Sequence, residues 1–391
     1  MVKRMLLFCA VLFSFSSLSA ATYHTGTVYF ASVTAANPHG CGDTLYDPEI
    51  TVLPGGDLQM YGQGNNSSRY VDEVFGFRRN QSTGDWPVPA GNGVPAWQGQ
   101  YTRCSYSPTT PGSLASPSIV KVGSTYYMAY SGGNADNITG RVYWATSTDG
   151  LTWTSLTVGA GTEGITPIIY GLYHDECTGL NGNSTASGVG QVELASDGGY
   201  FYFFLRYGHY ANGVQQSPFG ERIAFRINRD TAAPGDLGST RQIYYNGAWT
   251  SNSGKFVWTY DNQSAYGTDQ VLTPGHGTNM ALGAGDVKLD PQLDAFTGGD
   301  WIHFYQSVAG QPIYWEWTGS LSNGTWTYGG VVDLSTVTSA YPSATVYYPG
   351  LYFYHSELGG VTGSYVFLPI QDTCGGDFGG LRIISSSLSY Y

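Results

Sequence analysis

The stretch SPSIVKVGSTYYMAY, residues 116–130, is the part of the sequence that decides the fold. A small residue and a proline open it, an apolar alternation follows, a glycine marks a turn, and an aromatic run ends it. Alternation with a period of two on both sides of a short turn predicts two antiparallel strands. Residues 141–146 then read as a third strand, and the Asp149-Gly150 turn introduces a fourth at Trp153.

The same pattern recurs along the chain, which indicates a repeat architecture. Its copies begin at Asp47-Pro48, Ser116-Pro117, Gly190, Asp290-Pro291 and Tyr341-Pro342. Second strands are expected at 58–61, 126–130, 200–205, 301–305 and 351–354, and further third strands at 222–227 and 312–317. Four antiparallel strands are the unit of a propeller blade. We therefore predict an all-β fold, a single-domain five-bladed β-propeller over residues 22–391, in which residues 27–33 complete the last blade. A pair of β-sandwiches is the alternative architecture.

The N-terminus predicts secretion, to the extracellular space or the periplasm. Lys3 and Arg4 precede an apolar run over residues 5–18, and small residues follow up to Ala21. This is the layout of a signal peptide, so residues 1–21 are expected to be removed. The cysteines that remain form an even set, which predicts two disulfides with three possible pairings. They are Cys41, Cys104, Cys177 and Cys374.

Composition narrows the class of ligand. Charged residues make up 11% of the chain, while there are 55 glycines and 32 tyrosines, which suits short strands joined by tight turns. The formal net charge of −12 argues against nucleic acid, because phosphate binding needs clustered Lys and Arg. It also argues against an anionic membrane surface. A neutral ligand such as a carbohydrate fits better, and we expect a monomer.

The repeat also resembles a known family. Its Asp-Pro-x-Ile strand, its glycine turn and its Ser-x-Asp-Gly-x-x-Trp turn at 147–153 are similar to five-bladed propeller glycosidases. The closest types are the family 43 arabinofuranosidases and xylosidases and their fructosidase relatives. The resemblance implies a glycoside hydrolase that acts on arabinofuranosyl or xylosyl groups of oligosaccharides or polysaccharides, by inversion.

Such enzymes use three carboxylates from the inner strands of the first three blades: a general base, an orienting group and a general acid. Inversion needs an ionised carboxylate to activate water and a protonated one to supply the leaving oxygen. The resemblance implies that Asp47 is the base; the competing interpretation is a strand-entry Asp that binds nearby backbone. Ser116 departs from the pattern at the second position, and Asp290 shows the Asp-Pro context in the fourth repeat, which makes it a further catalytic candidate.

The third position departs as well. Val189 or Gly190 stands where the acidic Glu is expected, and Glu193 follows on the same strand. Alternation turns Glu193 toward the axis if its apolar neighbours pack between blades. A Glu at the solvent-facing rim is the competing interpretation. Two loop residues are rival acids: Glu163 and Glu176.

Three further residues are candidates for substrate binding. His276 lies in a Gly-His-Gly-Thr stretch that resembles one in fourth blades of family 43 enzymes, where a His points to the central channel and can help to hold a metal or water. The competing interpretation is a loop His that forms hydrogen bonds with backbone. Arg69 and Trp97 lie in the long loop after the first repeat, where they would form a wall over the channel; the competing interpretation is that they are exposed loop residues without a function. We assign no metal ligand and no cofactor. A calcium ion in the central channel remains an open alternative, although no run of carboxylates has EF-hand spacing.

Two other functions remain open. Because Ser116 and Val189 stand where the family has acidic residues, the chain could be a propeller that binds carbohydrate without cleaving it. The other alternative is a surface interaction module with a structural role, which would have no pocket at its axis. The absence of G-x-S-x-G, phosphate-loop, dinucleotide and H-E-x-x-H motifs argues against common esterases, kinases, dehydrogenases and zincins.

Overall fold

The computed structural model describes residues 21–29, 44–66, 71–79, 113–133, 141–155, 169–170, 185–211, 214–215, 221–229, 242–245, 248–251, 285–291, 293, 301–306, 310–323, 326–354, 362–371 and 381–391. The predicted all-β character is confirmed within these ranges, where the helical elements are α2 (Ser335–Ala340) and the 3-10 turn η3 (Leu321–Asn323). Within the same ranges, no helix has the length and apolar character needed to span a membrane.

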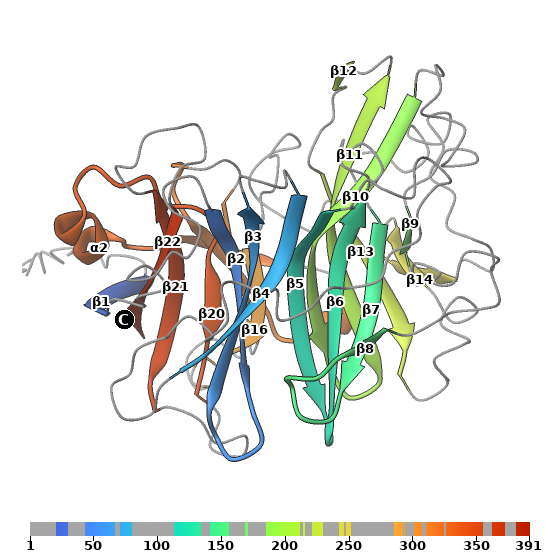
Figure 1. Ribbon diagram of the computed structural model, residues 1–391, viewed down its shortest axis with the longest axis horizontal. Helices are drawn as coiled ribbons and strands as arrows, with labels where there is room; N and C mark the ends of the chain where they lie inside the picture. Colours follow the sequence, from blue (N-terminus) through green and yellow to red (C-terminus); the bar gives the residue numbers. More distant parts are fainter. Residues whose placement is uncertain are drawn as a thin grey trace, which may run out of the picture.

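The described strands form five antiparallel sheets that follow one another along the chain (Figure 1). Sheet 1 consists of β2 (Thr44–Val52), β3 (Leu58–Asn66) and β4 (Val71–Arg78). Sheet 2 consists of β5 (Ser113–Val122), β6 (Thr125–Gly133), β7 (Arg141–Ser147) and β8 (Thr154–Ser155), with β9 (Ile169–Tyr170) also paired to β7.

The remaining three sheets are built in the same way. Sheet 3 consists of β10 (Thr185–Ser196), β11 (Tyr200–Ala211), β13 (Glu221–Asn228), β14 (Gln242–Tyr245) and β15 (Ala248–Ser251), with β12 (Val214–Gln215) paired to β11. Sheet 4 consists of β16 (Gly285–Leu289), β17 (Trp301–Tyr305), β18 (Tyr314–Thr318) and β19 (Thr327–Val331). Sheet 5 consists of β20 (Gly350–Tyr352), β21 (Ser364–Gln371), β22 (Leu381–Tyr390) and β1 (Tyr23–Tyr29).

One edge strand of each sheet faces the centre of the molecule, and we call β2, β5, β10, β16 and β20 the inner strands. β2 contacts β5, β5 contacts β10, β10 contacts β16, β16 contacts β20, and β20 contacts β2. The approach of the last sheet to the first is close, because a Cβ on Gly350 would lie 1.9 Å from the carbonyl oxygen of Pro48. Glycine is therefore required at this contact.

The N-terminal strand completes the last sheet, as the sequence predicts. β1 pairs with β22 over Tyr23–Tyr29, so the pairing begins before the predicted residues 27–33, of which 30–33 lie outside the described residues. Tyr23 anchors it: the side chain is 1% exposed, and its ring lies edge-on to Phe304 and Trp315, with centroids 5.0 Å away in both pairs. The two ends of the described chain are thus joined in one sheet.

The Asp-Pro and Ser-Pro dipeptides form bulges in the inner strands. The register of β2 against β3 shifts between Tyr46 and Glu49, and that of β5 against β6 shifts between Ala115 and Ser118. A proline cannot donate to the ladder, and a bulge leaves it outside the ladder while it re-aims the side chain before it. Asp47 and Ser116 accordingly have positive φ angles of 49° and 45°.

The fourth and fifth repeats begin elsewhere than predicted. β16 pairs with β17 without interruption from Gly285 to Leu289, so it ends before Asp290-Pro291, which was expected to open it. A continuous ladder has no bulge to accommodate proline, which explains why the dipeptide follows the strand. In the fifth repeat Tyr341-Pro342 follows α2, and the segment predicted as the second strand supplies the inner strand β20 instead.

The Ser-x-Asp-Gly-x-x-Trp segment forms the predicted turn between β7 and β8. Asp149 Oδ1 accepts hydrogen bonds from the backbone N–H groups of Leu151 and Thr152, at 2.8 and 2.7 Å, and from the hydroxyl of Ser147 at 2.8 Å. The N–H groups of Thr152 and Leu151 hold the pKa of Asp149 well below its ordinary value. The ionised carboxylate therefore fixes the turn.

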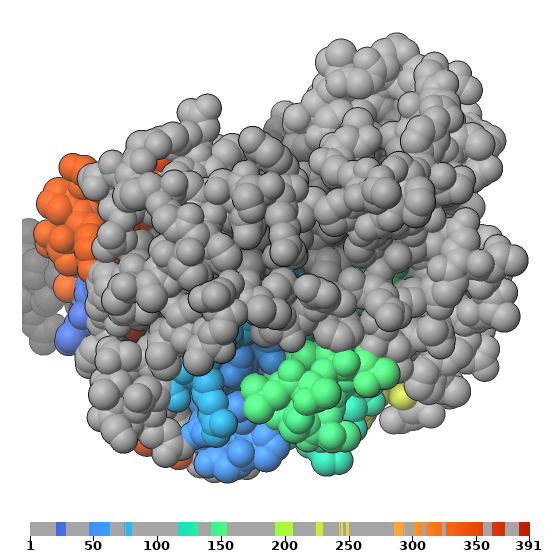
Figure 2. Space-filling view, in the orientation of Figure 1, coloured from blue at the N-terminus to red at the C-terminus, as the bar shows by residue number. Residues whose placement is uncertain are grey.

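This turn joins sheet 2 to sheet 1. The hydroxyl of Tyr61 on β3 donates to the carbonyl oxygen of Gly150 at 2.5 Å and accepts from Trp153 Nε1 at 3.0 Å. Figure 2 shows the β2–β3 hairpin and the turn in contact at one end of the molecule. Between sheets 2 and 3, the ring of Trp144 on β7 packs against Phe201 and Phe203 on β11. Aromatic residues thus fill the spaces between these sheets.

Candidate active site

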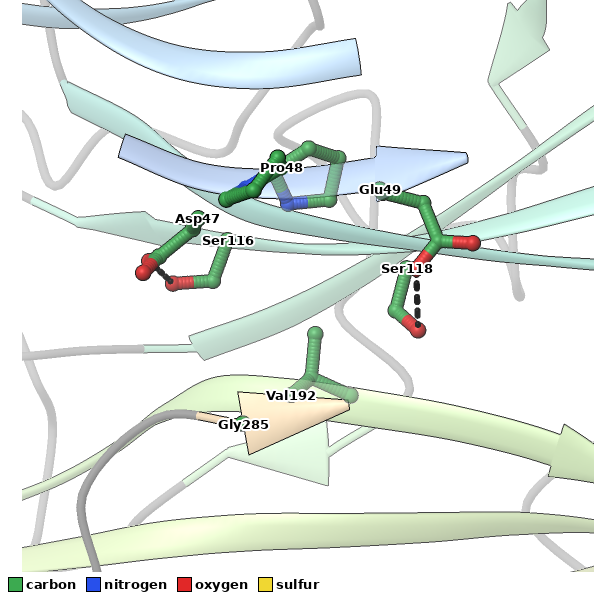
Figure 3. A pocket seen from close by; sticks show the side chains of 8 residues that line it. Asp47, Pro48, Glu49, Ser116, Ser118, Val192 and Gly285 are labelled. Atoms are coloured by element: carbon green, nitrogen blue, oxygen red, sulfur yellow. Dashed lines mark hydrogen bonds between the residues drawn. The ribbon is translucent and has the colours of Figure 1, made fainter. Parts of the chain in front are cut away.

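A pocket lies where the inner strands of four sheets meet (Figure 3). Its lining comprises Asp47, Pro48 and Glu49 of β2, Ser116, Pro117 and Ser118 of β5, Val192 of β10 and Gly285 of β16. The space between these walls, part of which is open to solvent, is about 280 Å³. Its position argues against an interaction module that has no pocket at its axis.

The predicted base lies in this pocket. Asp47 is half-buried, and its Oδ2 accepts a hydrogen bond of 2.8 Å from the hydroxyl of Ser116. Both side chains leave the strands at the bulges, and Figure 3 shows them pointing toward one another. The structure therefore brings the first two family positions together, with a hydroxyl where the family has a second carboxylate.

A second carboxyl group lines the same pocket and was not among the predicted catalytic residues. Glu49 is 2% exposed. Its Oε2 lies 3.5 Å from the hydroxyl of Ser118, and its Oε1 lies 2.5 Å from Lys288 Nζ. The Ser118 oxygen also accepts the backbone N–H of Leu194 at 2.9 Å. One polar network therefore links β16, β2, β5 and β10 at the pocket.

Lys288 holds two carboxyl groups rather than one. Its Nζ lies 3.2 Å from Asp286 Oδ1, and Asp286 Oδ2 accepts the backbone N–H of Leu351 at 2.8 Å. Burial raises the pKa of Glu49 to about 8, against the lowering effect of Lys288, and burial likewise raises the pKa of Asp286. Burial lowers the pKa of Lys288, but the two carboxylates outweigh it and hold the pKa above its ordinary value.

Glu193, the predicted acid, lies beside the pocket in a second buried network. Its Oε2 is 3.2 Å from His303 Nε2, and His303 Nδ1 is 2.7 Å from Glu316 Oε1. The interpretation of Glu193 as a rim residue is wrong, because it is 4% exposed and has this partner. Alternation places Val192 toward the pocket and Glu193 toward sheet 4.

The register of β10 shows which residue of the third repeat is equivalent to Asp47 and Ser116. The ladder with β11 shifts between Gly190 and Glu193, as it does in β2 and β5. This bulge gives Gln191 the position of Asp47, and gives Val192 the position of Pro48. By register, Gln191 rather than Val189 or Gly190 is equivalent to Asp47 and Ser116, and Glu193 is equivalent to Glu49.

Asp290 lies away from the pocket residues. It follows β16, is 3% exposed, and accepts a hydrogen bond of 2.7 Å from the hydroxyl of Tyr23. Burial, together with the charge of Asp290, raises the pKa of Tyr23. The other predicted residues lie outside the described residues: His276, Trp97, Arg69, Glu163, Glu176, Cys41, Cys104, Cys177 and Cys374. Within the described ranges, no three His, Cys, Asp or Glu side chains are arranged to hold a metal ion.

A sequence signal for the buried networks exists in sheet 4. Glu316 stands between two tryptophans in β18, and His303 stands between Ile302 and Phe304 in β17. A charged residue inside an aromatic strand is seldom buried without a partner. The sequence thus indicates two buried polar residues, although it does not pair them.

No protein-family model matches the chain, and no curated protein matches it in sequence. Solved structures with a similar fold include a family 117 glycoside hydrolase of the marine bacterium Zobellia galactanivorans, at 13% identity and a TM-score of 0.49 over 94% of this chain and 90% of that one. A family 43 endo-arabinanase from Bacillus licheniformis matches at 12% identity and a TM-score of 0.47, over 88% and 93%. A family 62 α-L-arabinofuranosidase from Coprinopsis cinerea matches at 10% and 0.46, over 95% and 97%. Family 43 is the family that the sequence resembles.

Proposed function

We propose that this chain is a secreted glycoside hydrolase whose five sheets are the blades of one closed β-propeller, residues 22–391, behind a signal peptide at residues 1–21. The cyclic contacts of the inner strands support the propeller. The observation that carries the function is the pair of carboxyl groups, Asp47 and Glu49, in a pocket at the centre of that ring. Paired carboxyl groups are what glycoside hydrolysis requires.

Asp47 acts as the general base in this proposal. It takes a proton from the water that attacks the anomeric carbon, and the hydroxyl of Ser116 orients its carboxylate. The small pocket and the resemblance to family 43 favour an arabinofuranosyl or xylosyl group as the sugar, with inversion at the anomeric carbon. A neutral glycan also suits the net charge of −12.

Kinetics on a panel of aryl arabinofuranosides and xylosides test this function. Wild-type protein is expected to hydrolyse at least one of them, and Asp47→Asn to lose roughly 100-fold or more in kcat, the contribution typical of general acid–base catalysis. Asp57→Asn, a carboxylate of the β2–β3 turn bound to Arg78, is the matched control and should keep full activity. Full activity of Asp47→Asn would show that Asp47 is not the base.

A non-catalytic carbohydrate-binding propeller is the second candidate. It is favoured by Ser116, Val192 and Gly285, which line the pocket without a charge. Its signature would be saturable binding of an oligosaccharide, weakened by Ser116→Ala, with no turnover of any sugar. Turnover by purified protein would exclude it.

A further inference from the structure

The proton balance of the buried Glu49–Lys288–Asp286 cluster has a chemical consequence. Two carboxyl groups share one ammonium group, so full ionisation would leave a net negative charge among residues that are 2% exposed or, for the Lys288 side chain, 17%. Uncompensated buried charge is strongly unfavourable. One retained proton makes the cluster neutral.

The contacts indicate where this proton resides. Both oxygens of Asp286 accept hydrogen bonds, from Lys288 and from the N–H of Leu351, which favours the ionised form. In Glu49, Oε1 accepts from Lys288, and Oε2 has the hydroxyl of Ser118 at the longer distance of 3.5 Å. The backbone N–H of Ile119 also donates to Glu49, but burial still raises its pKa. A proton on Oε2 keeps every one of the Lys288 and Asp286 contacts.

Only one of the two carboxyl groups can deliver the proton to a ligand in the pocket. Glu49 belongs to the described lining, and Asp286 does not. Asp47 and Glu49 flank Pro48 on β2, and Figure 3 shows their carboxyl groups at opposite sides of Pro48. Inverting glycosidases likewise keep their two carboxyl groups apart, so that a water molecule fits beside the sugar.

We propose that Glu49 is the general acid of this site and that Lys288 and Asp286 are positioning residues that hold its proton. The proposal rests on the function proposed above and replaces Glu193 and Asp290 in the acid role. In the step, the water oxygen bonds to the anomeric carbon while the glycosidic C–O bond breaks. Asp47 accepts a proton from the water, and Glu49 Oε2 gives its proton to the leaving oxygen. Solvent then removes the proton from Asp47 and returns one to Glu49.

The other charged groups near Glu49 lie on the strands that pack around it. Asp47 lies on the same strand, and Glu193 raises the pKa of Asp286 from β10. His303 and Glu316 bind Glu193 on the side of sheet 4. Ser118 on β5 presents a hydroxyl. Among the described charged groups, Lys288 is in direct contact with Glu49, and Asp286 raises the proton affinity of Glu49 through its charge.

Dependence of the rate on the leaving group tests the proposal. The substrates are the dinitrophenyl and phenyl glycosides of the sugar that wild-type protein hydrolyses best. A dinitrophenolate leaves without protonation, whereas a phenolate needs a proton from the general acid in order to leave. Glu49→Gln is expected to lose about 100-fold or more on the phenyl glycoside and less than about 10-fold on the dinitrophenyl glycoside. Its melting temperature checks folding. A uniform loss on both substrates, or the same leaving-group dependence in Glu193→Gln instead, would overturn the assignment.

The positioning role has a separate readout. In Asp286→Asn, the negative charge beside Lys288 is removed and Glu49 is the one carboxyl group of the cluster that still pairs with the ammonium group. The pKa of Glu49 should therefore fall. The alkaline limb of the pH–rate profile should move down by roughly one unit or more, a shift that a merely structural role would not produce. An unmoved limb contradicts that role.

Absence of any turnover by wild-type protein would overturn the proposed function and this proposal together, whereas turnover unchanged in Glu49→Gln would overturn this proposal alone.

Discussion

The hydroxyl of Ser116 donates a hydrogen bond of 2.8 Å to the carboxylate of Asp47, and both residues precede a proline at a bulge of an inner strand. Their positive φ angles turn the two side chains out of the ladders and toward each other. The same dipeptide pattern that marks the repeats in the sequence therefore also builds the polar pair in the pocket.

Removal of the Ser116 hydroxyl should weaken catalysis without unfolding the protein. Ser116→Ala is expected to lower kcat/KM by about 10-fold or more, the scale of one hydrogen bond to a charged group, and to move the acidic limb of the pH–rate profile to higher pH. Ser116→Asn should restore part of the activity, because Asn can donate and tolerates a positive φ. Equal rates in the wild type and in Ser116→Ala would contradict the orienting role.

The contact between sheets 1 and 2 depends on one hydroxyl. Tyr61→Phe removes the group that joins Gly150 to Trp153 and leaves a buried N–H and a buried carbonyl without that partner. We expect a loss of about 1–3 kcal/mol in the free energy of unfolding, measured by urea denaturation. Tyr127→Phe, at a half-buried tyrosine of β6, is the matched control and should change stability by less than about 0.5 kcal/mol. Similar losses in both variants would refute the special role of Tyr61.

Glu49 should make stability depend on pH. Its pKa is raised from 4.5 to about 8 in the folded protein, so the folded state holds a proton that the unfolded state releases between these values. Stability is then fully present below about pH 4.5 and is lost as the pH rises toward 8. In Glu49→Gln this part of the pH dependence should disappear, as followed by urea midpoints from pH 5 to 9. Parallel curves for Glu49→Gln and wild type would contradict the raised pKa.

Attachment of the N-terminal strand should contribute strongly to stability. Tyr23→Ala removes a fully packed ring and its hydrogen bond to Asp290. We therefore expect the free energy of unfolding to fall by about 3–5 kcal/mol. Tyr391→Ala changes a side chain that is 72% exposed and should have little effect. Comparable unfolding midpoints for Tyr23→Ala and wild type would show that β1 is not needed to complete sheet 5.

The sequence was informative where a local rule determines the structure. Proline next to an acidic or hydroxyl residue located the first strands of the first two repeats, β2 and β5, and the Asp149 turn was correct because its hydrogen bonds are local. The fourth and fifth repeats were misplaced because the same dipeptides there follow the strand or the helix α2. No local rule separates a proline inside a bulge from one beyond a strand.

The site was predictable only in part. Asp47 was recognised by its Asp-Pro context, but Glu49 was not among the predicted site residues. Its partner Lys288 lies 239 positions away, and no local pattern joins two such residues. Glu193 was placed on the correct strand, yet its direction depends on the bulge at Gln191 and Val192, which lacks the proline that marks the other two.

The most direct test of the central claim is a proton NMR time course of the anomeric signals during hydrolysis of an arabino- or xylo-oligosaccharide. We expect wild-type protein to release first the anomer inverted relative to the substrate, and Asp47→Asn to release no detectable sugar although it still binds the oligosaccharide. Release of the retained anomer, or equal release by Asp47→Asn, would contradict a pocket in which Asp47 activates water for an inverting hydrolysis.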